Sequence, residues 1–114
     1  MRKQMMENAA SEVATQVREV EDSIEVALGE LAELHSRLVH ARGVTGCNYV
    51  TIQAAFEKLA TTTSSLIEAR GGIGLCHLAL AEAKQTIPGL RTVGFGDEGP
   101  CPKTAGSADL RIVA

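Results

Sequence analysis

Several residue types that stabilise or functionalise other small proteins are scarce in this chain. Aromatic residues make up 3% of its 114 residues and tryptophan is absent, so alanine and aliphatic side chains must supply the packing. The three cysteines, Cys47, Cys76 and Cys101, contain no CxxC pair, which argues against a disulfide framework and favours reduced thiols. No stretch has the length and apolarity of a membrane span or a signal peptide. We therefore expect a soluble, cytoplasmic protein with no membrane association.

Clusters of lysine and arginine are also missing. The net charge is −3, and the whole excess of acids lies in residues 1–42, which hold eight acids against five bases. Binding to phosphate backbones needs clustered positive charge, so we expect no nucleic-acid partner. The acids of this first segment are interpreted as a solvated outer face.

What the sequence does contain is a seven-residue apolar repeat on both sides of Gly43–Gly46. In each half, two stripes alternate at the three- and four-residue spacing of a helix with one apolar seam. The stripes of the first half are Ala10, Val17, Ile24, Leu31 and Leu38, and Met6, Val13, Val20, Ala27, Leu34 and Ala41. Those of the second half are Ile52, Leu59, Leu66, Ile73 and Leu80, and Ala55, Thr62, Ala69, Cys76 and Ala83.

These stripes predict an all-α fold, a long antiparallel, coiled-coil-like helical hairpin over residues 1–87. The first helix is expected over about residues 5–42, capped by Asn8 or Ser11 at its start and by Gly43 at its end. A turn follows at 43–47, and a second helix runs over about 48–86. Pro88 prevents the second helix from continuing.

The mirrored numbering of the stripes also predicts how the helices face each other. Leu38 is expected opposite Ile52 and Leu31 opposite Leu59, with the remaining seam residues following in the same register. This register brings each base of the second helix opposite an acid: Lys58 opposite Glu30, Arg70 opposite Glu21 and Lys84 opposite Glu7. The small stripe that begins at Ala55 then lies in the seam and predicts helices packed closer than in a leucine zipper.

A further apolar face remains on the second helix. Because two helices cannot cover both faces, we expect a homodimer that forms a four-helix bundle. The predicted dimer interface consists of Ala60, Ile67, Gly71, Gly74, Leu75, Leu78 and Ala81. Glycines 71, 72 and 74 indicate either a close helix crossing at this interface or a kink that splits the second helix.

Residues 88–114 have no helical period and are expected to form an irregular, flexible tail. The segment Gly94–Gly99 matches the GxGxxG dinucleotide pattern, but no strand precedes it and no helix follows, so we interpret it as a loop. The last five residues, Leu110–Ala114, are prone to form a strand. They would pair with the sheet edge of a partner, pack on the bundle or stay frayed.

No arrangement of residues points to catalysis, a cofactor or a metal. His35 and His40 lie near the turn, yet neither has the neighbours of a phosphotransfer motif, and Cys76 and His77 lie at the opposite end of the hairpin. We therefore expect a non-enzymatic, homodimeric protein-interaction module with a still unidentified protein partner, of the adaptor, assembly or export chaperone, or regulator type. The alternatives are histidine phosphotransfer through His35 or His40, and a bundle that opens to hold an apolar ligand.

Overall fold

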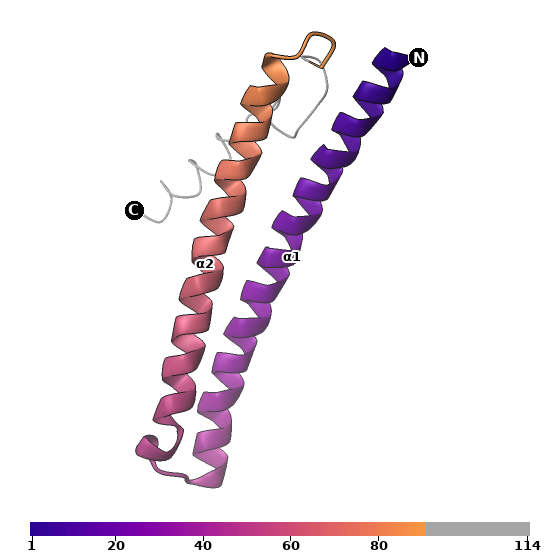
Figure 1. The fold of residues 1–114 in the computed structure, drawn as a ribbon. Helices are drawn as coiled ribbons and strands as arrows, with labels where there is room; N and C mark the ends of the chain where they lie inside the picture. Colours follow the sequence, from indigo (N-terminus) through magenta and orange to yellow (C-terminus); the bar gives the residue numbers. More distant parts are fainter. Residues whose placement is uncertain (91–114) are drawn as a thin grey trace, which may run out of the picture.

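A computed structural model describes residues 1–90 and shows two long helices in an antiparallel hairpin (Figure 1). Helix α1 runs over Arg2–Thr45 and helix α2 over Tyr49–Gln85. At 1.5 Å per residue, α1 is about 66 Å long. The all-α hairpin expected from the sequence is confirmed. The segment Gly94–Gly99, the strand-prone C-terminus and Cys101 lie outside the described residues.

The turn between the helices is shorter and later than the sequence suggested. Helix α1 continues past Gly43 and ends at Gly46, whose φ of 68° is left-handed and whose N–H donates to the carbonyl of Arg42. The side chain of Asn48 then caps α2 by accepting a hydrogen bond from the N–H of Val50 at 3.1 Å. Arg42 spans the turn, because its Nε donates to the carbonyl of Cys47 and its guanidinium lies 3.7 Å from the centre of the Tyr49 ring.

The start of α1 also differs from the expectation. The helix begins at Arg2 with Met1 at the N-cap position and no side-chain cap, so Asn8 and Ser11 lie inside the helix. Asn8 instead accepts a hydrogen bond from Gln4 on the helix surface. An uncapped end of this kind is the part of a helix that frays most readily.

Because the turn is centred on Cys47, the predicted register is wrong by about one helical turn. Arg70 pairs with Glu25 and not with Glu21, and Glu30 lies beside Thr62 and Ser65 and not beside Lys58. The contact between Glu21 and His77 agrees with this later register, because the predicted register placed Arg70, and not His77, opposite Glu21. Close to the turn, His35 contacts Phe56 and Arg42 contacts Tyr49, and these two pairs keep the predicted spacing.

One predicted stripe of each helix does form the seam. Its members are all buried or half-buried, and they are Ala10, Val17, Ile24, Leu31 and Leu38 with Ile52, Leu59, Leu66, Ile73 and Leu80. The second seam stripe of α2 consists of the residues one position after the predicted small stripe, and Phe56, Thr63 and His77 are its half-buried members. The small stripe predicted for that place is exposed at all five positions, Ala55, Thr62, Ala69, Cys76 and Ala83. The expected close packing of the two helices on these small residues is therefore wrong.

The glycines of α2 neither break the helix nor mark a crossing within the chain. Helix α2 is uninterrupted from Tyr49 to Gln85. A Cβ atom built on Gly71, Gly72 or Gly74 would meet nothing within 4 Å. Of the two alternatives, a kink that splits the second helix is thus not observed, and these positions border open space in the hairpin.

The helices lie close together at the turn and diverge towards the other end, where the chain beyond α2 leans towards α1 (Figure 1). Ile87, Pro88, Gly89 and Leu90 form a type II turn, in which Gly89 has a φ of 93° and the N–H of Leu90 donates to the carbonyl of Ile87. Leu90 is 9% exposed and packs in a cluster with Ala10, Ala14, Met6 and Leu80. The turn thereby places one large side chain where the diverging helices leave room.

The burial achieved by this hairpin is modest. No large side chain among the described residues is fully buried, and the buried apolar residues are Ala10, Ala14, Val17, Leu59, Ala81 and Leu90. Within residues 1–90, neither helix is apolar enough over a sufficient length to cross a bilayer.

The packing of Leu90 makes a testable prediction. Leu90→Ala should lower the free energy of unfolding by about 2 kcal/mol, because it removes a buried aliphatic side chain at the open end. Urea unfolding followed by circular dichroism at fixed protein concentration measures this change. The matched control is Val44→Ala at the exposed end of α1, which should change stability by less than about 0.5 kcal/mol. Equal effects of the two substitutions would contradict the packing described for Leu90.

Candidate functional site: an apolar groove and a polar cluster

An apolar groove follows one open side of the seam. Three hollows make it up. Two of them share Ala27 and Leu66, and the third lies at the end remote from the turn, around Met6, Val13 and Ala83. We call it the open groove, and its principal residues are Met6, Val13, Val20, Ala27 and Leu34 from α1 with Thr62, Ala69 and Ala83 from α2. Cys76 lies one heptad from both Ala69 and Ala83 and belongs to the same stripe of α2.

The open groove is built from the two stripes that the sequence predicted as the second seam layer. In the structure they lie beside the seam, and Val13 and Leu34 are 44% and 46% exposed. In a two-stranded coiled coil these flanking positions are commonly charged, whereas apolar residues there are typical of helices that pack against more than one neighbour. The hairpin therefore presents a largely apolar surface drawn from both helices, and polar side chains such as Glu19, Glu30 and Ser65 lie at its border.

The interface predicted from the sequence lies elsewhere on α2. Ile67, Leu75 and Leu78 are exposed, but none of them borders the open groove. Gly74 borders a hollow formed with Glu21, Glu25 and Arg70. Ala81 is buried within the chain at 9% exposure, so it is removed from the accessible part of this face. Helical periodicity places the remaining residues on the side of α2 remote from the open groove.

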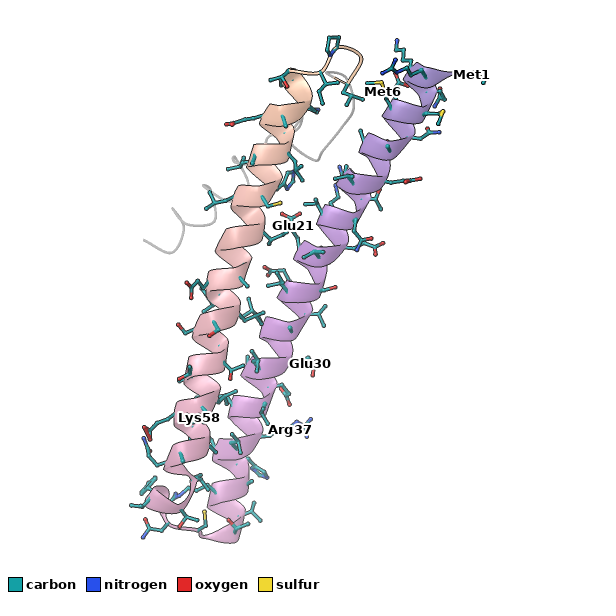
Figure 2. All side chains as sticks on the ribbon, viewed as in Figure 1. Met1, Met6, Glu21, Glu30, Arg37 and Lys58 are labelled. Carbon is teal, nitrogen blue, oxygen red and sulfur yellow. The ribbon has the colours of Figure 1, made fainter. Side chains whose placement is uncertain are left out.

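A polar cluster occupies the seam on that other side. Glu21 lies between the two helices (Figure 2), and one of its carboxylate oxygens is 3.2 Å from Nδ1 of His77. One turn further along α1, Glu25 accepts a hydrogen bond from Nε of Arg70. This hydrogen bond, together with the charge of Glu25, raises the pKa of Arg70 above its usual value. Because the Glu25–Arg70 pair is exposed, it contributes more to the choice of register than to stability.

His77 is the least solvated member of the polar cluster. Its side chain is 17% exposed, and within the described part of the chain its buried Nε2 atom has no hydrogen-bond partner. A buried nitrogen without a partner costs free energy relative to an apolar group of similar size. The sequence predicted that Arg70 and Glu21 face each other across the seam, but it did not predict that Glu21 contacts His77 or that Arg70 pairs with Glu25.

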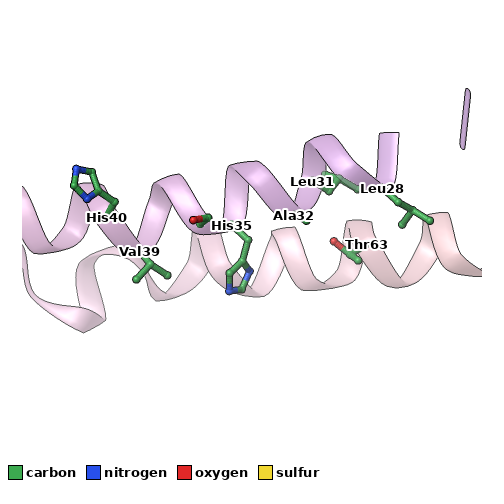
Figure 3. A pocket seen from close by; sticks show the side chains of 8 residues that line it. Leu28, Leu31, Ala32, His35, Val39, His40 and Thr63 are labelled. Carbon is green, nitrogen blue, oxygen red and sulfur yellow. The ribbon is translucent and has the colours of Figure 1, made fainter. Parts of the chain in front are cut away.

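The two other histidines do not converge on a common site. His35 reaches from α1 to α2, where its ring makes an edge contact with Phe56 at 5.4 Å between centroids, while His40 points away from α2 (Figure 3). Both histidines border a shallow hollow with Leu28, Val39 and Thr63. Across residues 1–90, no group of three or more histidine, cysteine, aspartate or glutamate side chains is arranged to hold a metal ion.

Comparison with known proteins assigns no family to this arrangement. No protein-family model matches the chain, and no curated protein or solved structure matches it either.

The position of His77 leads to a prediction about stability. His77→Leu should leave the midpoint of thermal unfolding unchanged or raise it by a few degrees, because leucine fills the seam without a buried, unpartnered nitrogen. Glu21 retains access to water after this change, since its side chain is 32% exposed. Thermal unfolding followed by circular dichroism provides the measurement. A loss of more than about 1 kcal/mol would show that the contact with Glu21 outweighs the cost of the unpaired nitrogen.

Proposed function

We propose that this protein is a non-enzymatic, homodimeric helical scaffold for protein interactions. Two hairpins pack through their open grooves into a four-helix bundle, and the surfaces left outside bind a protein partner. The observation that carries this proposal is the apolar groove contributed by both helices. Adaptors, assembly or export chaperones and regulators are the types of protein to which such a scaffold belongs.

The available area is sufficient for a stable dimer. A helix pair is about 20 Å across and the hairpin is about 60 Å long, so one face offers on the order of 1,200 Å². Stable interfaces bury about 800 Å² on each partner. The seam of a single hairpin leaves Val13 and Leu34 in contact with water, and pairing the grooves would cover them.

Two surfaces stay outside such a bundle and support a role in binding. One is the exposed face of α2 that contains Ile67, Leu75 and Leu78. The other is the outer face of α1, where the acidic excess of the chain lies. A partner with an apolar helix would fit the first surface, and a basic partner the second.

A pair of matched valine substitutions tests the dimer. Val13→Asp places a charge in the open groove and should convert the dimer to a monomer at micromolar concentration, because pairing the grooves would bury that charge. Val26→Asp is the control, since Val26 is 65% exposed and does not border the groove. Light scattering coupled to size-exclusion chromatography gives the molar mass of each variant.

A third variant separates the groove from the interface that the sequence predicted. Leu78→Asp changes the opposite side of α2 and should leave the dimer intact. Dissociation by Leu78→Asp together with a stable Val13→Asp dimer would assign the interface to the face of Ile67 and Leu78. A wild-type protein that is monomeric at these concentrations would refute the proposal.

A further inference from the structure

We infer that the two hairpins of the dimer join with their turns at the same end, so that α1 of each copy packs against α2 of the other. This inference rests on the proposed dimer and adds the orientation of the second copy. The open groove admits two arrangements related by a two-fold axis. One has the turns together and α1 facing α2, and the other has the turns at opposite ends and each helix facing its own counterpart.

The sizes of the side chains along the groove favour the first arrangement. The α1 border carries mainly large side chains, Met6, Val13, Val20 and Leu34, with Ala27 as its one small member, and these form a ridge. The α2 border carries Ala69, Cys76 and Ala83, which form a furrow. With the turns together, each ridge enters a furrow of the second copy, and large residues alternate with small ones across the interface.

With the turns at opposite ends, the same residues fit less evenly. The two ridges would then meet along one half of the interface and the two furrows along the other. The α2 helices would have to approach closely while the α1 helices stayed apart. Two equal contacts between ridge and furrow fill the interface without such a distortion.

The distribution of charge gives an independent argument. Residues 1–42 hold eight acids and five bases, whereas residues 43–87 hold three of each. With the turns together, the two acidic α1 helices occupy diagonal positions, and each is flanked by the balanced α2 helices. The opposite arrangement places the two acidic helices side by side, where like charges repel each other.

Distances between spin labels distinguish the arrangements. Both samples share a cysteine-free background of Cys47→Ala, Cys76→Ala and Cys101→Ala. The first sample adds Val44→Cys at the turn end of α1, where the side chain is 73% exposed. The second adds Glu68→Cys, an exposed position near the middle of α2, as the matched control. Double electron–electron resonance measures the distance between the labels of the two copies.

The expected result is a distance of no more than about 30 Å at both positions, since neighbouring helices are only about 10 Å across. A short distance at position 68 with about 60 Å at position 44 would overturn the orientation and leave the proposed dimer standing, because opposite turns are separated by the length of the hairpin. The absence of any measurable distance at either position, with circular dichroism showing intact helices, would refute the dimer as well.

Discussion

Three residues, Gly46 to Asn48, connect two helices of more than thirty residues each, and this short connection determines how the helices face each other. Gly46 ends α1 in a left-handed conformation, Asn48 caps α2, and Arg42 bridges the two ends. A loop this short leaves little freedom for the helices to slide. Each layer of the seam further along the hairpin, including the Glu21–His77 contact, follows from where this turn is placed.

The register set by the turn explains why the hairpin exposes an apolar groove. Each helix carries two apolar stripes, but the seam uses only one of them, together with a neighbouring stripe that contains polar residues such as Glu21 and His77. The stripe left over on α1, which contains Val13 and Leu34, then lies beside the leftover stripe of α2, which contains Ala69 and Ala83. A third and fourth helix from a second copy would complete this interior, which is the physical basis for the proposed dimer.

The heptad pattern was enough to predict two long antiparallel helices and one stripe of the seam on each, because that stripe is apolar at each position from Ala10 to Leu38 and from Ile52 to Leu80. It was not enough to predict the second stripe. Ala69 and the other small residues of its stripe are more apolar than Arg70 or His77, so apolarity alone predicts the small stripe for the seam. The turn decided otherwise, since glycines at both 43 and 46 are plausible helix ends and only the later one is used. Placing the turn at Gly46 shifts the register by about one helical turn and brings the polar cluster into the seam.

A native cysteine in the groove, Cys76, can report whether a second copy of the chain covers the groove. Cys76 is exposed in the single hairpin, whereas Cys47 at the turn is half-buried. The most direct test of the account is the rate of alkylation of Cys76, followed for each cysteine by mass spectrometry of the digested protein. We predict that Cys76 reacts more slowly than Cys47 at high protein concentration and becomes faster on dilution, as the two copies separate. Rapid, concentration-independent alkylation of Cys76 would contradict the claim that a second copy covers the groove.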